Sequence, residues 1–334
     1  MSILPFVSIV VPVFNDEKTI ELCLNTLLRQ SYPLKEIIVV NDGSTDKTQI
    51  ILSRLAEENQ LLRIIQNKHS GITITRNIGI INAKGDIVFF GEGDAIYKQD
   101  YLAKAVEFLV KNPNMGGVCL TGAPWVRKWN LVTHSIDAEN RIQRKMLEEG
   151  KLKVFYAWVY RKSVLKSVDM FDSRIFQAED KDLFLRLTKR GYPIGLINGI
   201  YWRHIRDQDL PKFIKRNYNG GKTRVLFLIK HRKATDFLRT VGFLWYVLVA
   251  TVFGLLFPIL YTSVLLAVCS LLIYKLIVVL KFGWSVVRRK RDLFFLPLFT
   301  LIRHISTAIG TTHGIILFSL GKLRKKTINW NSIS

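Results

Sequence analysis

Short apolar runs alternate with longer amphipathic segments along the first third of the chain. Four runs rich in β-branched residues predict buried strands at Val7–Val13, Ile37–Val40, Leu62–Gln66 and Ile87–Phe90. Three segments with helical spacing lie between them, at Thr19–Gln30, Ser44–Asn59 and Ile72–Asn82. Strand and helix in alternation are typical of a mostly parallel sheet with helices on both faces. We therefore expect an α/β fold whose ligands bind beyond the carboxyl ends of the strands.

The middle of the chain has a less regular pattern. It predicts helices at Tyr101–Lys111 and Asp180–Arg190, and strands at Gly116–Gly122, Val154–Tyr160 and within Tyr192–Tyr201. Residues 123–150 are polar and helix-prone, and their pattern indicates no place for them in the sheet. We expect this segment to shape the site of an acceptor substrate.

The last third is dominated by apolar residues. From Val241 to Leu280 the single charge is Lys275, and this run is about twice the ~20 residues that cross a bilayer as a helix. It predicts a hairpin of two transmembrane helices, at about 241–258 and 262–280. A further stretch, 293–320, contains Arg303, His304 and His313, which are unfavourable inside a bilayer. We expect it to form an interfacial or re-entrant helix, with a third span as the alternative. The pattern thus divides the chain into residues 1–235 and a membrane domain, 236–334.

The charge distribution supports that division. The chain has 334 residues, of which 49 are basic and 26 acidic, for a formal net charge of +23. Such an excess suits nucleic acid or an anionic membrane surface, but no nucleic-acid-binding motif accompanies it. Basic residues instead flank the apolar segments, as is typical of cytosolic membrane flanks. We therefore expect an integral protein of the cell membrane with a cytosolic catalytic domain, membrane lipids as partners and no nucleic acid. Three widely spaced cysteines predict neither disulfides nor a zinc site.

Two acidic clusters follow predicted strands. In Asn41-Asp42-Gly43-Ser44-Thr45-Asp46, an aspartate at a strand end can bind a base or a ribose, although a plain strand–turn–helix connection explains the same residues. Glu92 and Asp94 flank a glycine after a buried strand, where their repulsion favours a bound cation. Carboxylates together with substrate phosphates are typical ligands of Mg²⁺ or Mn²⁺. An ordinary acidic turn is the alternative.

Three further groups carry candidate chemistry. Glu179 and Asp180 open a predicted helix, where acids stabilise the helix dipole but where a carboxylate can also act as a general base. Arg76 can clamp a diphosphate or lie on a helix surface. Trp202 can stack on a sugar, and His204 can bind a metal or phosphate, although a core tryptophan beside a solvated histidine is equally ordinary.

Taken in order, these motifs resemble the family 2 glycosyltransferases, inverting enzymes with the Rossmann-like GT-A fold. The resemblance covers Val7 to Arg206 and includes Ser8–Asn15, Val40–Asp46, Arg76–Gly79, Glu92–Asp94 and Glu179–Asp180. It implies a nucleotide site formed by Pro12, Phe14, Asn15, Asp16, Asp42, Arg76 and Glu92. It also implies that Asp94, Glu92 and His204 hold Mg²⁺ or Mn²⁺, that Asp180 is the catalytic base with Glu179 beside it, and that Trp202 and Asp182 face the acceptor.

Three positions depart from the family pattern. Glu92 replaces the usual first aspartate of the metal motif, Ala95 stands where many members have another acid, and Gly91 replaces an apolar residue. We therefore expect the donor sugar and the metal affinity to differ from those of other family members more than the activity does.

The predicted function is an inverting, metal-dependent glycosyltransferase. It moves a sugar from a UDP- or GDP-linked donor to a hydroxyl of a lipid-linked or growing glycan at the cytosolic membrane face. The alternative is a polyprenyl-phosphate glycosyl synthase of the dolichol-phosphate-mannose type, whose phosphate acceptor needs no base. A third possibility is an inactive scaffold that binds nucleotide sugars.

Overall fold

The fold is described from a computed structural model of the chain. It describes residues 4–126, 129–151, 156–175, 178–206, 209–231 and 292–320, and scattered positions between 270 and 287. Its contacts divide the chain into two compact units. Among the described residues, the first comprises 4–125, 156–175 and 178–206, and the second comprises 126, 129–151, 209–231 and those between 270 and 320. The domain boundary predicted near residue 235 lies outside the described residues.

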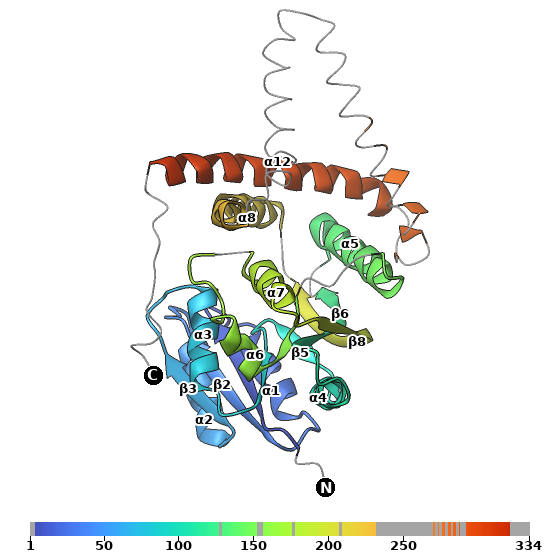
Figure 1. The fold of residues 1–334 in the computed structure, drawn as a ribbon. Coiled ribbons are helices and arrows are strands. Elements are labelled where there is room, and N and C mark those ends of the chain that lie inside the picture. Colours follow the sequence, from blue (N-terminus) through green and yellow to red (C-terminus); the bar gives the residue numbers. More distant parts are fainter. Residues whose placement is uncertain are drawn as a thin grey trace, which may run out of the picture. The chain divides into compact units, whose positions relative to one another are not determined.

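The first unit is built on one mixed sheet (Figure 1). Its strands are β1 (Val7–Val13), β2 (Lys35–Asn41), β3 (Leu62–Gln66), β4 (Ile87–Phe90), β5 (Ala95–Tyr97), β6 (Gly117–Val126), β7 (Val159–Arg161) and β8 (Ile194–Arg206). They lie in the order β3-β2-β1-β4-β7-β6-β8-β5. The first four are parallel, whereas β7 runs antiparallel to β4 and β6, and β5 runs antiparallel to β8.

Helices cover both faces of this sheet because its central strands are apolar on both sides. Along β1, Val7, Ile9 and Val11 belong to one core cluster and Val10 to the other, as the alternation of side chains in a strand requires. The first cluster includes side chains of α1 (Ile20–Leu28), α2 (Thr48–Glu58) and α4 (Tyr101–Lys111). The second includes side chains of α3 (Ile72–Asn82), α6 (Lys162–Ser167) and α7 (Glu179–Lys189).

The predicted α/β architecture is confirmed, with one substantial addition. The four predicted parallel strands and the helices between them are present. The antiparallel half of the sheet is not apparent from the sequence, because its pairs join segments far apart in the chain. For example, β5 has three residues and pairs Ala95 with His204. This pairing aligns the acidic turn after β4 with the last strand.

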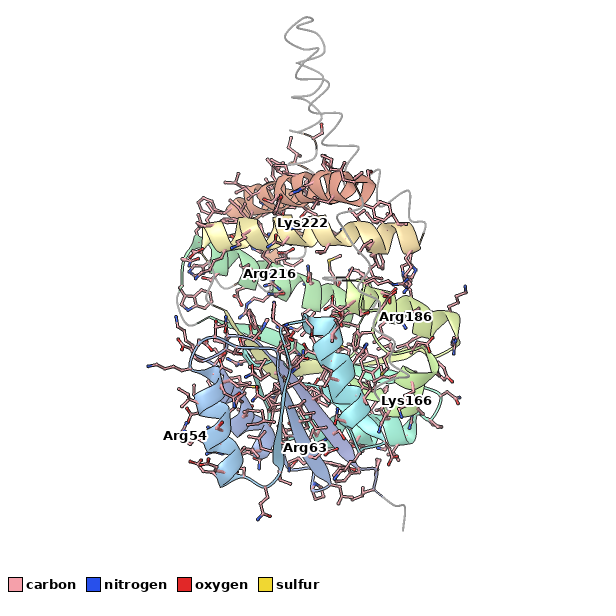
Figure 2. The ribbon with its side chains drawn as sticks, turned by 90° about the vertical axis from the view of Figure 1, so that its left-hand side faces the viewer. Arg54, Arg63, Lys166, Arg186, Arg216 and Lys222 are labelled. Carbon is pink, nitrogen blue, oxygen red and sulfur yellow. The ribbon has the colours of Figure 1, made fainter. Side chains whose placement is uncertain are left out.

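The second unit is helical. It contains α5 (Leu131–Glu148), α8 (Leu210–Lys230) and α12 (Asp292–Ser319). Figure 2 labels two basic side chains of α8, Arg216 and Lys222. Glycines allow α8 and α12 to pack backbone against backbone: a Cβ on Gly221 would lie 2.0 Å from the Thr307 carbonyl oxygen, and one on Gly310 would lie 1.9 Å from that of Tyr218. In the segment 123–150, which the sequence pattern left unplaced, residues 129–150 belong to this unit.

The prediction of an integral membrane protein is corrected by the structure. No helix in the part of the chain that the structure describes combines the length and apolar character needed to cross a membrane. The stretch 293–320, for which a third span was the alternative, forms α12. The two predicted hairpin helices, 241–258 and 262–280, lie almost entirely outside the described residues.

Candidate active site

A pocket of about 410 Å³ opens at the carboxyl ends of the parallel strands. This is the edge at which α/β sheets bind ligands, and the volume suits a small organic ligand. Its lining comes from the loops after β1, β2, β3 and β4 and from the N-terminal ends of α3 and α7. The lining residues are Pro12, Val13, Phe14, Asp16, Asp42, His69, Gly71, Ile72, Thr75, Arg76, Glu92, Gly93, Asp94 and Glu179.

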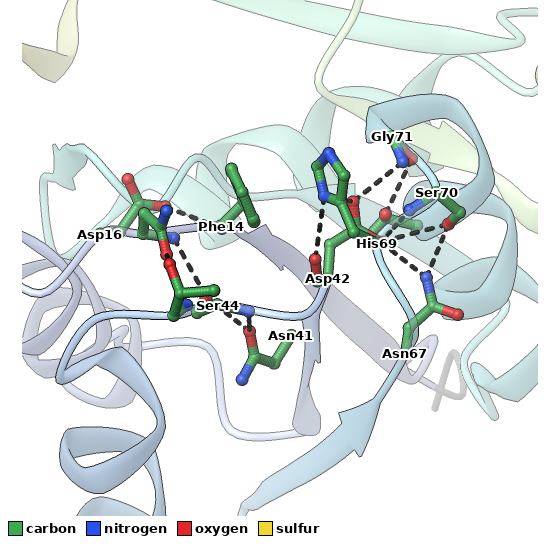
Figure 3. Close-up of polar contacts among 12 residues, drawn as sticks. Phe14, Asp16, Asn41, Asp42, Ser44, Asn67, His69, Ser70 and Gly71 are labelled. Carbon is green, nitrogen blue, oxygen red and sulfur yellow. Dashed lines mark hydrogen bonds and ion pairs between the residues drawn. The ribbon is translucent and has the colours of Figure 1, made fainter.

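Asp42 organises one wall of the pocket by holding the loop between β3 and α3 (Figure 3). Its Oδ1 accepts hydrogen bonds from Asn67 Nδ2 at 2.7 Å, Ser70 N at 2.9 Å and Ser70 Oγ at 3.1 Å. Its Oδ2 accepts one from Gly71 N at 2.9 Å and lies 3.1 Å from His69 Nδ1. The predicted base-binding residue is therefore in the pocket, but neighbouring protein donors already bind both of its oxygens.

The loop after β1 has a similar supporting role. Asn15 adopts a positive φ of 55°, and its side-chain oxygen accepts a hydrogen bond from Thr45 N at 2.8 Å. Its own N–H donates to Ser44 Oγ at 3.0 Å. Asn15 therefore ties this loop to the loop after β2 and is not among the residues that line the pocket, in contrast to its predicted nucleotide contact. The ring of neighbouring Phe14 does line the pocket.

Three predicted metal ligands lie together. Donor atoms of Glu92, Asp94 and His204 all fall within 4.8 Å of one another. His204 Nε2 lies 2.7 Å from Asp94 Oδ1 and 3.5 Å from Glu92 Oε2. An octahedral ion with bonds of about 2.1 Å has neighbouring ligands roughly 3 Å apart, so this arrangement fits one. The two carboxylates suit Mn²⁺ and Mg²⁺ alike.

Asp16 extends the negative charge of this cluster. Burial, together with the charge of Asp94, raises the pKa of Asp16 to about 6. The Asp16 carboxylate packs against the turn, because a Cβ on Gly93 would lie 2.8 Å from Asp16 Oδ2. A side chain at position 93 would therefore displace the Asp16 carboxylate. Since three carboxylates repel one another here, a bound cation would stabilise them all.

The predicted catalytic acids are held by Arg76. The Nη1 atom of Arg76 lies 3.2 Å from Glu179 Oε1 and 3.0 Å from Asp180 Oδ1, across more than 100 positions of sequence. Burial alone would lower the pKa of Arg76, but the charges of Asp180 and Glu179 outweigh it and raise that pKa. Burial and the charge of Asp180 raise the pKa of Glu179, and the charge of Arg76 partly offsets this rise. The cation therefore links α3 to the start of α7.

This placement changes the role predicted for Arg76. Its side chain is only 5% exposed and lies 5.2 Å from the ring centre of Phe171, 5.8 Å from that of Phe90 and 5.9 Å from that of Trp158. A guanidinium enclosed by rings and bound to two carboxylates positions those carboxylates, and it is not a mobile clamp for a diphosphate. The next residue, Asn77, also positions its surroundings, because it exchanges two hydrogen bonds with the backbone of Phe171.

Two residues predicted to face the acceptor are engaged elsewhere. Asp182 is fully buried, and its Oδ2 accepts a hydrogen bond from Arg186 Nε at 2.8 Å. Arg186 in turn donates to the Met170 carbonyl oxygen at 2.7 Å, so the pair supports the loop before α7. Trp202 donates its Nε1–H to the Leu120 carbonyl oxygen at 2.9 Å and packs against the core. Burial and these bonds explain why neither side chain lines the pocket.

Sequence reasoning missed the loop after β3. Asn67, His69, Ser70 and Gly71 all contact Asp42, and His69 and Gly71 also line the pocket. The signal was present, because this polar loop follows a parallel strand at the same sheet edge as Asp42. What the sequence lacked was any indication that these donors converge on one carboxylate.

Comparison with known proteins agrees with this geometry. The profile of Glycosyl transferase family 2 matches residues 8–169. The uncharacterized glycosyltransferase EpsJ of Bacillus subtilis is 29% identical over 59% of this chain and 60% of its own length. A dolichyl N-acetyl-alpha-D-glucosaminyl phosphate 3-beta-D-2,3-diacetamido-2,3-dideoxy-beta-D-glucuronosyltransferase of Methanococcus voltae is 27% identical over 80% of this chain and 88% of its own length. The chain thus covers less than two thirds of the length of EpsJ.

Solved structures support the fold. The mannosyltransferase PcManGT from Pyrobaculum calidifontis, in complex with GDP-Man and Mn²⁺, has a TM-score of 0.60 at 16% identity, over 93% of this chain and 88% of its own. S. aureus TarS 1–349 in complex with UDP-GlcNAc has a TM-score of 0.51 at 18% identity, over 97% and 95%. The profile match, the sequence relatives and the ordered motifs lead to one conclusion: residues 8–169 of the chain form a glycosyltransferase domain of family 2.

Proposed function

We propose that the chain is an inverting glycosyltransferase that transfers its sugar to a hydroxyl of a lipid-linked or growing glycan. The observation that carries the proposal is the pair of carboxylates, Glu179 and Asp180, that Arg76 holds at the start of α7. A hydroxyl is a poor nucleophile until a positioned base accepts its proton. An acceptor phosphate is already ionised and would not need this arrangement.

In this proposal Asp180 is the catalytic base. Its side chain is 31% exposed, whereas that of Glu179 is 11% exposed. Arg76 binds Oδ1 of Asp180, and among the described residues none donates a hydrogen bond to Oδ2. Oδ2 is therefore the atom that accepts the acceptor's proton. The oxygen freed of this proton attacks the anomeric carbon opposite the leaving diphosphate, which inverts that centre.

The nucleotide binds at the other acids of the pocket. Asp42 and Phe14 contact the base, with Pro12 beside them, and Asp16 and Glu92 lie toward the ribose and diphosphate. Glu92, Asp94 and His204 hold Mn²⁺ or Mg²⁺, both of which suit carboxylate ligands. When bound, the ion neutralises charge on the departing diphosphate as a Lewis acid. The protein's own contribution is to keep three donor atoms converged before the substrate arrives.

The second candidate is transfer to a polyprenyl phosphate. It is favoured by one observation, that the name of the M. voltae relative includes a dolichyl phosphate. That same name describes transfer to a sugar already on the lipid, which agrees better with a hydroxyl acceptor. An inactive scaffold is disfavoured by the family membership together with the intact acidic positions.

The test is transfer by the full chain from a panel of UDP- and GDP-sugars, with Mn²⁺ or with a chelator. Two matched acceptors are offered, a polyprenyl phosphate and a polyprenyl-diphosphate-linked N-acetylhexosamine. We expect Mn²⁺-dependent product with inverted anomeric configuration from the second acceptor. Product from the bare phosphate alone would replace the proposal with the second candidate. Retained configuration would contradict the role of Asp180.

A further inference from the structure

The side chain of His69 occupies the place where the pocket should receive a nucleobase. Its ring packs against the ring of Phe14, with centroids 4.2 Å apart and planes tilted by 31°. Its Nδ1 lies 3.1 Å from Oδ2 of Asp42 and 3.1 Å from the carbonyl oxygen of Asp42 (Figure 3). Since both neighbours of Nδ1 are acceptors, this nitrogen carries the proton. His69 thus presents a flat ring to Phe14 and a ring N–H to Asp42.

A nucleobase would make the same two contacts. Uracil and guanine are flat rings that each have a ring N–H, and a buried carboxylate beside an aromatic side chain is suited to bind both features. A base could not enter between the two rings as they stand. Carbon layers pack at about 3.5–4.0 Å, so a base between Phe14 and His69 would need about 7–8 Å. The histidine and the base therefore exclude each other on this face of Phe14.

The His69 side chain can move into solvent without disrupting the loop that forms this wall of the pocket. Its side chain is 60% exposed, whereas that of Asp42 is 5% exposed. Without His69, the loop is still bound to Asp42 through Asn67, Ser70 and Gly71. Departure of the imidazole would expose the Phe14 ring and free one acceptor position on Asp42 Oδ2. These are the two features that the base would use.

We propose that His69 is an intramolecular competitor of the nucleobase and thereby sets the affinity for the nucleoside diphosphate. This inference rests on the proposed nucleotide site. The conformation with His69 against Phe14 is closed to the base, and the conformation with His69 in solvent is open. The apparent dissociation constant is the intrinsic one divided by the open fraction, so weakening the closed state tightens binding.

The test measures Kd for UDP and GDP by calorimetry on the full chain at one fixed Mn²⁺ concentration. We expect His69→Ala to bind the preferred nucleotide about threefold to tenfold more tightly than wild type, the range expected for one aromatic contact. His69→Gln, which keeps an N–H donor but has no ring, should fall between the two. Lys68→Ala is the matched control, an exposed neighbour in the same loop, and should leave Kd within about twofold. Inorganic pyrophosphate, which has no base, should bind wild type and His69→Ala equally.

Two results would overturn the inference. Unchanged nucleotide binding in His69→Ala would show that the imidazole does not affect the base, and weaker binding would show that it is part of the base site. If the alanine variant were unstable, the same results in His69→Gln would lead to the same conclusions. The proposed site itself is tested in the His69→Ala background. There, adding Phe14→Ala must weaken binding, and if it does not, the base binds elsewhere and the site assignment fails. The two failures are therefore distinguishable.

Discussion

The acid that follows β2 and the acids that open α7 are held in opposite ways. Asp42, at the end of β2, is bound by neutral backbone and side-chain donors together with His69, all from one short loop. Glu179 and Asp180, at the start of α7, share a single guanidinium from α3. The first arrangement is redundant, because no single donor carries it. The second depends on one side chain, and we therefore expect it to be far more sensitive to substitution.

The largest effect is expected for Asp180→Asn. An amide keeps the size and the contact with Arg76 but cannot accept a proton, so kcat should fall about 10²–10⁴-fold, the usual contribution of a general base. The donor's Kd should stay near the wild-type value. Steady-state transfer to a hydroxyl acceptor measures the first quantity and calorimetry the second. Asp86→Asn, at an exposed acid of the same unit, is the control, and normal transfer by Asp180→Asn would remove the base assignment.

Arg76→Met should cause the largest loss of stability. It leaves two acids without their shared cation, and breaking a buried pair in this way costs about 3–5 kcal/mol. Urea denaturation measures this change in the free energy of unfolding. The control is Arg54→Met, which removes an ion pair with Glu21 between side chains that are 52% and 46% exposed (Figure 2). Exposed pairs contribute about 0–1 kcal/mol. Equal losses in both variants would contradict the dependence of the α7 acids on Arg76.

Asp42→Asn should have an intermediate effect. The NH₂ group of the asparagine amide must face N–H or O–H donors of the loop, which then lose their acceptor. A buried donor left without an acceptor costs about 1–3 kcal/mol. Because the remaining oxygen still accepts hydrogen bonds from the loop, the loss should stay below that of Arg76→Met. Asp100→Asn is a suitable control, since the Asp100 side chain makes no capping hydrogen bond. Faster hydrogen exchange at the amides of Ser70 and Gly71 would locate the damage, and unchanged exchange would contradict it.

The same contrast explains what the sequence could predict. The β1-to-β4 half of the sheet follows from local periodicity, and the acids at its edge follow from the rule that parallel strands bind ligands at their carboxyl ends. The partners of those acids do not follow. Arg76 meets Glu179 across 103 positions, and His204 meets Asp94 across 110. Such contacts depend on the whole topology, which no local pattern contains.

The helical unit shows a second limit. Hydrophobicity and flanking basic residues predicted membrane spans, and among the described residues no helix is long and apolar enough to cross a bilayer. For α12, apolar positions are explained in part by packing within the unit, where Leu293 and Leu296 lie in a core cluster with Ala138 and Ile142 of α5. An apolar stretch can therefore pack against a lipid bilayer or against other helices of the protein, and the sequence does not indicate which.

The smallest effect, and the sharpest test of the contrast, is expected for Glu179→Gln. Burial and the charge of Asp180 raise the pKa of Glu179 above its usual value of 4.5, so the folded state binds this proton more tightly than the unfolded state. The contribution of Glu179 to stability therefore declines as pH rises from about 4.5 through the raised pKa of the folded state. Glutamine does not titrate, so the Glu179→Gln variant should lack this decline. The free energy of unfolding of the variant at pH 8 should stay within about 1 kcal/mol of that of wild type.

Urea denaturation between pH 5 and 8 measures the difference, with Glu107→Gln, at a 53% exposed side chain, as the control. If Glu179→Gln instead lost as much stability as Arg76→Met at every pH, Glu179 would be the principal partner of the guanidinium. Asp180 would then be bound weakly enough to move with the acceptor.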